Sequence, residues 1–195
     1  MMPERISESA ALADMLARIA RHTDQPLVVA IDGRSGSGKS TLAKALAQKL
    51  DAAVIEGDDF YAGGTMLRDD SPAARAAACI DWRKQQTVVE DLRAGHEAQW
   101  HPFDWKAFDG SLCAAATRLA PRAVIILEGT YAARPELADL VDLRILVTIP
   151  DDERRARLMA REGNIGAWER QWHEAEDHYF GAVMPPDGFD VIFSG

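Results

Sequence analysis

The chain has 195 residues and a formal net charge of −9, and it is 47% hydrophobic and 27% charged. A chain of this size and apolar content can bury one large core, which excludes a mainly disordered protein. The acidic balance argues against a nucleic-acid backbone as the main partner, so any anion must be held by a local site.

The N-terminal residues contain no apolar signal core, and the apolar runs are too short to span a bilayer. Cys79 and Cys113 stand far apart with no metal-ligand spacing, which indicates two free thiols. We therefore expect a soluble, cytoplasmic protein with neither nucleic acid nor a membrane as partner. Self-association into a homo-oligomer stays open.

Helices are predicted over residues 8–21, 39–50, 84–94 and 151–162, from apolar residues at three- and four-residue spacing or from capping signals. Ile6 is counted with the apolar residues of the first of these helices. Short continuous apolar runs predict buried strands at residues 27–31, 52–55, 123–127, 143–147 and 191–193. Strands that alternate with helices indicate an α/β fold, with a mainly parallel five-stranded sheet between helices in a three-layer sandwich. Residues 1–195 are predicted to form a single domain, with residues 60–110 as an inserted region.

One segment carries most of the chemical information. Residues 33–40 read Gly33-Arg34-Ser35-Gly36-Ser37-Gly38-Lys39-Ser40 and fit G-x-x-x-x-G-K-[ST] between a predicted strand and a predicted helix. Such a loop cradles phosphates with backbone N–H groups, while Lys39 reaches the β- and γ-phosphates and Ser40 reaches Mg²⁺. Thr41 continues into the helix and is counted with the nucleotide-binding residues. A glycine-rich turn without a ligand is the alternative, and nucleoside triphosphate binding is the favoured reading.

A GTPase needs a guanine-reading Asn/Thr-Lys-x-Asp segment. The chain has a single Asn, Asn164, and none of its five lysines lies in that pattern. The sequence thus favours phosphoryl transfer to a small molecule over GTP-driven switching. That reaction needs a carboxylate for the acceptor hydroxyl, an acidic group near Mg²⁺ and arginines for the transferring phosphoryl group.

Two acidic positions follow predicted strands, where parallel sheets bind ligands. Asp58 and Asp59 come shortly after the second strand, and Glu128 ends the third. A solvated turn and a salt-bridged glutamate are the respective alternatives. We predict that Asp58 faces the substrate and that Glu128 lies near magnesium.

Arginines gather late in the chain, at residues 154, 155, 157, 161 and 170. Arg154, Arg157 and Arg161 share one face of a predicted helix, and two glycines follow it at residues 163 and 166. A solvated helix face and a lid that closes over phosphates are both open readings. The lid would span residues 154–172. Aromatic residues gather at residues 100–108, where they either pack a subdomain or stack on a planar base.

With these residues assembled, the chain resembles the uridine kinase and phosphoribulokinase branch of P-loop kinases from about Leu27 to Tyr179. The likeness rests on the phosphate loop, on segments 58–61, 80–82 and 127–131, and on the arginine-bearing helix. It implies ATP and Mg²⁺, with Asp58 as base and with Glu128 and Ser40 at magnesium. It also implies ribose contact by Asp81 and lid roles for Arg157 and Arg161.

The substrate region departs from that family. Uridine kinases usually carry Asp-His-Pro near Asp81, and a Tyr and a His in the hairpin where this chain has Trp100 and His101. The expected acceptor site therefore consists of Asp58, Tyr61, Asp81, Trp100 and His101, with a nucleoside as the favoured acceptor. A kinase of another alcohol (pantothenate, a sugar or a sugar phosphate) and a regulatory ATP-binding protein are the alternatives.

Overall fold

The computed structural model describes residues 2–195. The central sheet follows the order β1-β8-β7-β2-β6-β3, and every neighbouring pair is parallel. Its strands are β1 (Glu4–Ile6), β2 (Leu27–Asp32), β3 (Ala53–Glu56), β6 (Val124–Glu128), β7 (Leu143–Thr148) and β8 (Val191–Ser194). The predicted α/β class with a parallel sheet is confirmed.

The sheet has six strands, so the predicted number of five is wrong. The additional strand is β1, which lies at the sheet edge and pairs with β8 from Glu4 opposite Val191 to Ile6 opposite Phe193. With only three residues, two of them charged, it has no apolar run that a sequence pattern could reveal. Ile6 therefore belongs to a strand, and the helix that follows begins at Ser9.

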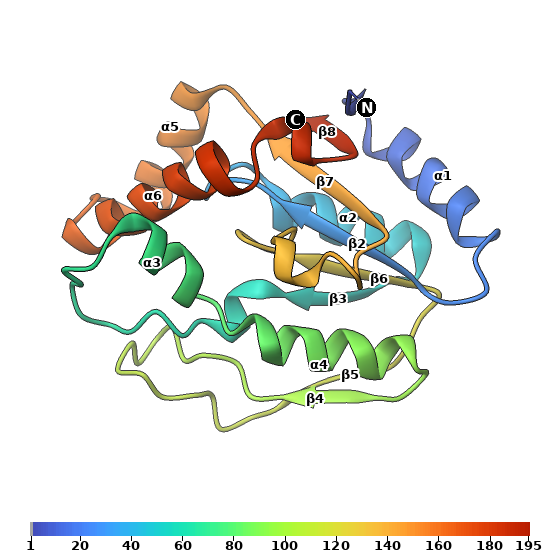
Figure 1. Cartoon of the computed structure of the whole chain (residues 1–195), viewed down its shortest axis with the longest axis horizontal. Coiled ribbons are helices and arrows are strands. Elements are labelled where there is room, and N and C mark those ends of the chain that lie inside the picture. Colours follow the sequence, from blue (N-terminus) through green and yellow to red (C-terminus); the bar gives the residue numbers. More distant parts are fainter. Residues whose placement is uncertain (1) are drawn as a thin grey trace.

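The main helices are α1 (Ser9–Ala20), α2 (Lys39–Leu50), α3 (Pro72–Ala78), α4 (Trp82–Arg93), α5 (Asp151–Glu162) and α6 (Ala167–His178). Short turns of helix lie at η1 (Gly57–Phe60), η2 (Pro135–Leu137), η3 (Tyr179–Val183) and η4 (Pro186–Gly188). A two-stranded antiparallel hairpin, β4 (Ala98–Trp100) with β5 (Thr117–Leu119), stands apart from the main sheet. Figure 1 shows it beneath α4, at the bottom of the view.

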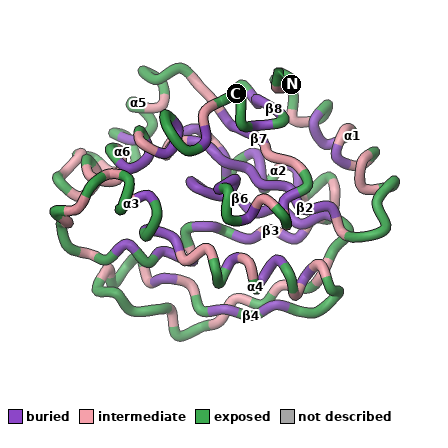
Figure 2. The backbone as a smooth tube through the Cα atoms, in the orientation of Figure 1, coloured by how far each residue is buried: buried purple, intermediate pink, exposed green. Residues whose placement is uncertain are grey.

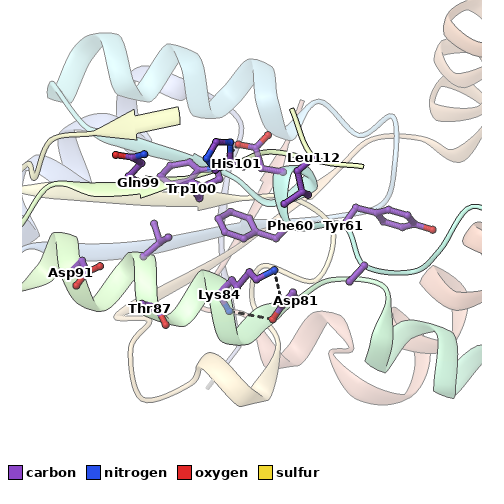
Figure 3. Close-up of a pocket in the computed structure, with 13 residues that line it drawn as sticks. Phe60, Tyr61, Asp81, Lys84, Thr87, Asp91, Gln99, Trp100, His101 and Leu112 are labelled. Atoms are coloured by element: carbon purple, nitrogen blue, oxygen red, sulfur yellow. Dashed lines mark hydrogen bonds and ion pairs between the residues drawn. The ribbon is translucent and has the colours of Figure 1, made fainter. Parts of the chain in front are cut away.

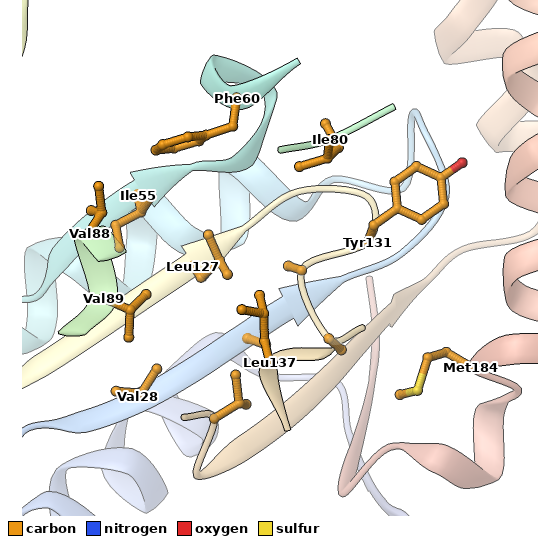
Figure 4. Packing of buried hydrophobic residues seen from close by; sticks show 14 of the residues in the cluster. Val28, Ile55, Phe60, Ile80, Val88, Val89, Leu127, Tyr131, Leu137 and Met184 are labelled. Atoms are coloured by element: carbon orange, nitrogen blue, oxygen red, sulfur yellow. The ribbon is translucent and has the colours of Figure 1, made fainter. Parts of the chain in front are cut away.

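Helices cover both faces of the sheet because its central strands are apolar on both sides. Along β2, Val28 belongs to one buried cluster and Val29 to another. The cluster around Val29 takes in Leu16 of α1 and Leu46 of α2. The cluster around Val28 includes Val88 and other residues of α4 and of the inserted region (Figure 4). The central strands are accordingly buried along their length (Figure 2).

The carboxyl ends of β2, β3 and β6 lie at the same edge of the sheet. Glu56 and Glu128 are register partners, and Ile31 pairs with Glu128 one strand further on. The loop after β2 and the turn after β3 therefore meet at one place. This edge carries the candidate site.

Candidate active site

Glycines shape the loop that joins β2 to α2. Gly33, Gly36 and Gly38 have φ values of 150°, 82° and 100°. A Cβ on Gly33 would stand 2.6 Å from the Val147 carbonyl oxygen, and one on Gly36 would stand 3.0 Å from Cγ of Leu158. The loop passes this close to β7 and α5 only because these positions have no side chain.

Lys39, the first residue of α2, keeps its charge free for an anion. The side chain is buried, and its Nζ donates to the carbonyl oxygen of Arg34 at 3.2 Å across the loop. Among residues 2–195 no carboxylate lies within ion-pair distance of this ammonium group. A buried cation held by one neutral carbonyl, beside the start of a helix, fits a bound phosphate.

A cleft of about 330 Å³ opens over the loop. It is lined by Ser35, Gly36, Gly38, Lys39, Ser40, Thr41, Asp58, Glu128, Gly129, Thr130, Arg157, Leu158 and Arg161. Residues from the loop, η1, the end of β6 and α5 thus meet in one cavity. Of the predicted site residues, Lys39, Ser40, Asp58, Glu128, Arg157 and Arg161 are all brought together here, next to Thr41.

The two carboxyl groups of the cleft hold their protons more tightly than usual. Burial raises the pKa of Glu128 to about 7, against the opposing charge of Lys39. The side chain of Asp58 is exposed toward the cleft, yet the surrounding protein displaces part of its water, and this desolvation raises its pKa against the charges of Lys39 and Arg161. A carboxylate with a raised pKa is a better proton acceptor near neutral pH.

Other residues of the loop turn away from the cleft. Arg34 forms an ion pair with Asp177 of α6, and its guanidinium lies 5.4 Å from the centre of the Phe180 ring. Ser37 is buried, and its Oγ has no hydrogen-bond partner among residues 2–195. The side chains of these two predicted nucleotide-binding residues therefore contribute to the shape of the loop and do not line the cleft.

The arginine-bearing helix α5 packs directly on the loop. Arg154 donates from Nη1 to the Ser35 carbonyl oxygen at 3.3 Å, and Leu158 is buried against Gly36. Arg157 and Arg161 line the cleft from the same face. Arg155 is 71% exposed and pairs with Asp151 on the outer side. Spacing along the helix thus separates arginines that face the cleft from one that faces water.

A second groove, of about 380 Å³, lies on the other side of η1 between α4 and the hairpin (Figure 3). It is lined in part by Asp59, Tyr61, Asp81, Trp100 and His101. Trp100 donates from Nε1 to Oδ2 of Asp59 at 2.7 Å. Four of the five residues predicted to bind the acceptor therefore share one groove, while Asp58 lies in the neighbouring phosphate cleft.

Within this groove, three of the predicted acceptor residues form hydrogen bonds with the protein itself. The Tyr61 hydroxyl donates to the Gly64 carbonyl oxygen at 2.6 Å, and in Figure 3 it points away from Phe60 and Trp100. His101 is exposed, and its Nδ1 lies 2.9 Å from the Cys113 carbonyl oxygen. Asp81 caps α4 by accepting from the Lys84 backbone N–H at 3.2 Å.

Sequence reasoning missed two buried carboxylates beside the loop. Asp32 accepts from the backbone N–H groups of Gly33, Tyr131 and Ala133 and from the Tyr179 hydroxyl, at 2.7–3.0 Å. Glu176 of α6 accepts from Ser35. The position of Asp32 between a strand and the loop was a usable signal. Nothing in the sequence around Glu176 relates it to a loop 141 residues away.

The acidic residues form no metal site by themselves. Within residues 2–195 there is no group of three or more His, Cys, Asp or Glu side chains placed to hold an ion. Mg²⁺ in nucleotide sites is bound through phosphate oxygens and only one or two protein oxygens. Ser40 and Glu128 line the same cleft, and Ser40 hydrogen bonding partly opposes the raised pKa of Glu128. These two oxygen donors fit such an ion.

A strand, a glycine-rich phosphate loop and a helix, with a lysine and carboxylates at the end of a parallel sheet, define a P-loop protein. The family described as AAA domain matches residues 29–177. The chain belongs to this family of P-loop domains. No helix of residues 2–195 combines the length and the apolar character that a membrane crossing requires.

Curated relatives include several uridine kinases. The chain is 27% identical to the uridine kinase of Clostridium perfringens strain 13 over 173 residues, which cover 83% of this chain and 79% of that protein. It is 28% identical to the uridine kinase of Mycoplasma genitalium, over 77% of this chain and 76% of that one. The resemblance inferred from the motifs is therefore confirmed.

Solved structures give the same fold. A possible uridine kinase from Bacillus stearothermophilus aligns with a TM-score of 0.66 at 23% identity, covering 94% of this chain and 99% of that one. A candidate fructose transport system kinase from a Silicibacter species aligns with a TM-score of 0.74 at 26% identity, covering 96% and 100%. The two proteins bear different substrate names, so the fold leaves the acceptor undetermined.

Proposed function

We propose that this chain is an ATP- and Mg²⁺-dependent kinase that transfers the γ-phosphoryl group to a hydroxyl of a small molecule, with a nucleoside as the favoured acceptor. The observation that carries the proposal is the meeting of Lys39, Asp58, Glu128 and Arg161 in one cleft. Phosphoryl transfer requires groups of these four kinds: a cation for the phosphates, a base for the hydroxyl, an oxygen ligand near the metal and a mobile cation for the transferring group.

Each residue has a proposed part in the reaction. Lys39 and the loop N–H groups bind the β- and γ-phosphates, while Arg157 and Arg161 stabilise the charge on the transferring group. Asp58 takes the proton as the acceptor oxygen bonds to the γ-phosphorus and the bond to the β,γ-bridging oxygen breaks. Ser40 and Glu128 would hold Mg²⁺, which would supply positive charge to the phosphate oxygens.

The groove beside η1 supports an acceptor without a phosphate group. Asp59, Asp81 and Asp91 line it together with Lys84 and His101. The Lys84 ammonium lies 3.3 Å from a carboxylate oxygen of Asp81, so its charge is already compensated. A phosphorylated acceptor would meet an excess of negative charge there. This argues against the sugar-phosphate alternative.

An unphosphorylated sugar is the second candidate acceptor. It is supported by the 26% identity and near-complete overlap with the candidate fructose transport system kinase. A nucleoside acceptor is supported by the curated uridine kinases at 27–28% identity. Both candidates carry primary hydroxyl groups, so the catalytic residues proposed here are the same for each.

A single panel assay tests the proposal. ATP turnover is measured with nucleosides, sugars, sugar phosphates and pantothenate, each added separately, and the phosphorylated product is identified by mass. Product formation from a nucleoside supports the favoured acceptor, and formation from a sugar alone supports the second candidate. Slow hydrolysis that no acceptor accelerates would overturn the kinase proposal in favour of a regulatory ATP-binding protein.

With the best acceptor, Asp58→Asn should lower kcat by about 10² to 10⁴, because it removes the proton acceptor and preserves the side-chain shape. ATP affinity should change little. Asp59→Asn is the matched control, since an Asn oxygen still accepts from the Trp100 indole. A greater loss in Asp59→Asn than in Asp58→Asn would contradict the assignment of the base.

A further inference from the structure

A fully buried carboxylate lies against the phosphate loop. Glu176 of α6 has no exposed surface. Its Oε1 accepts from the Ser35 backbone N–H at 3.0 Å, from Ser35 Oγ at 2.5 Å and from the Trp172 indole Nε1 at 2.8 Å. The Thr130 hydroxyl also donates to this oxygen, at 3.4 Å. Four donors therefore converge on one carboxylate oxygen, and two of them belong to a single residue of the loop.

The other oxygen of this carboxyl group, Oε2, is buried without a hydrogen-bond partner in the described part of the chain. No Lys, Arg or His of residues 2–195 forms an ion pair with Glu176. Burying a charge without a cation is costly, and a negative charge beside a phosphate site also opposes anion binding. A residue that served only to fill space here would be apolar.

Ser35 is where this carboxylate acts on the loop. Ser35 lines the phosphate cleft, and its carbonyl oxygen accepts from Arg154 of α5. Its N–H and hydroxyl are both held by Glu176, so its backbone is fixed from two sides by two different helices. The glycines on either side of Ser35 leave the loop backbone free to adopt other conformations in the absence of such contacts.

Trp172 extends the contact toward the acceptor side. Its indole N–H is shared between Glu176 and Ser35 Oγ, which lies at 3.0 Å. Its ring stacks on Trp168 with centres 5.9 Å apart, and it also packs against Tyr61 at 5.9 Å. Tyr61 directly follows η1, which carries Asp58. One helix thus contacts both the phosphate loop and the segment after the proposed base.

We propose that Glu176 is a positioning residue that fixes Ser35 in the conformation that binds nucleotide, and that Trp172 couples this contact to Tyr61, the residue after η1. The proposal rests on the part of the proposed function that assigns ATP to the loop. It does not depend on which acceptor is used. It is tested by ATP binding as well as by turnover.

Glu176→Ala should weaken ATP affinity about tenfold, measured by titration calorimetry with Mg²⁺, because a charge-assisted hydrogen-bond acceptor is lost and its donors remain buried. Glu176→Gln keeps an acceptor oxygen and should restore affinity to within about threefold. In steady-state assays the rise should appear in the KM for ATP more than in kcat.

Glu174→Gln is the matched control. Glu174 lies on the same helix, is 58% exposed and pairs with Arg75, with no contact to the phosphate loop. The ATP affinity of Glu174→Gln should equal that of the wild type. An equal loss of affinity in both variants would indicate a general weakening of α6, and an unchanged ATP affinity in folded Glu176→Ala would overturn the proposal.

Trp172→Phe keeps the ring and removes the donor, so it tests the coupling even where Glu176→Ala does not fold. It should weaken ATP binding about two- to fivefold alone, and by less in the Glu176→Gln background, because the indole donates more weakly to a neutral acceptor. Additive losses in the double variant would contradict the coupling. If these variants lose ATP affinity while no compound of the acceptor panel is phosphorylated, the role of Glu176 is supported and the kinase proposal is overturned.

Discussion

Asp32 shows how one side chain can hold the active-site edge of the sheet together. Its two carboxylate oxygens accept from backbone N–H groups on the phosphate loop and on the segment after β6, and from the Tyr179 hydroxyl. Burial raises its pKa from 3.8 to about 6, and these hydrogen bonds limit the rise. The folded protein therefore binds this proton more tightly than the unfolded chain does.

The sign of the resulting pH dependence follows directly. The stabilisation from this proton is complete below about pH 3.8 and is lost as the pH rises through about 6. Asp32→Asn does not titrate, so the unfolding free energy of the wild type should fall relative to that of the variant by about 3 kcal/mol across this interval. Denaturant unfolding at a series of pH values measures the difference, and a constant difference would contradict the prediction.

Asp58 and Asp59 are adjacent in the sequence but line different cavities. In an extended segment, Asp59 would point to the opposite side from Asp58. The segment is instead a 3₁₀ turn, in which Asp59 accepts from Trp100 and lines the groove between α4 and the hairpin. The two neighbouring acids still face different cavities. The reason is the position of the 3₁₀ turn between the two cavities, and it is not the side-to-side alternation of an extended strand.

At the scale of elements, α5 joins the phosphate loop to the arginines of the proposed lid. Leu158 is buried against Gly36, which anchors the middle of the helix, and Arg161 is 63% exposed near its end. An arginine that still reaches water while lining the cleft can move onto a phosphoryl group without breaking the packing of the helix. The end of α5 is therefore the part best placed for closure.

Arg161→Ala should lower kcat more than it weakens ATP binding, because the guanidinium acts on charge that develops during transfer. Steady-state kinetics and ATP titration on the same preparation separate the two effects. Arg155→Ala is the control, since Arg155 is 71% exposed and pairs with Asp151 away from the cleft. Normal kinetics in Arg161→Ala would indicate that the arginines of α5 form a solvated helix face and have no role in phosphoryl transfer.

At the scale of the whole molecule, the sheet separates two cores with different relations to the site. One core contains α1 and α2, and the other contains the inserted region and α6. No residue of α1 lines the phosphate cleft or the groove between α4 and the hairpin. Changes in α1 should therefore affect stability without affecting the site.

Leu16→Ala should lower the unfolding free energy by about 3 kcal/mol, the usual cost of a cavity at a fully buried leucine. ATP affinity should stay unchanged. Leu67→Ala makes the same chemical change at a side chain that is 61% exposed, and should cost less than about 0.5 kcal/mol. Denaturant unfolding measures both, and an altered ATP affinity in Leu16→Ala would contradict the expectation that changes in α1 leave the site unaffected.

The sequence by itself determined the α/β class, the phosphate loop at residues 33–40 and the helices at 39–50 and 151–162. Each of these depends on a local pattern: an apolar run, a helical spacing, or a motif whose glycines and lysine are adjacent in the chain. The carboxyl ends of parallel strands meet at one edge, which is why Asp58 and Glu128 could also be placed near the loop in advance.

Three features were set only by the tertiary structure. These are the pairing of the sixth strand, the separation of the phosphate cleft from the groove between α4 and the hairpin, and the contacts of Asp32 and Glu176. β1 is recognised by its pairing with β8, near the other end of the chain. Glu176 accepts hydrogen bonds from Ser35, 141 residues away in the sequence, and from Trp172 of α6. Such contacts depend on packing between distant segments, and no periodicity in the sequence encodes them.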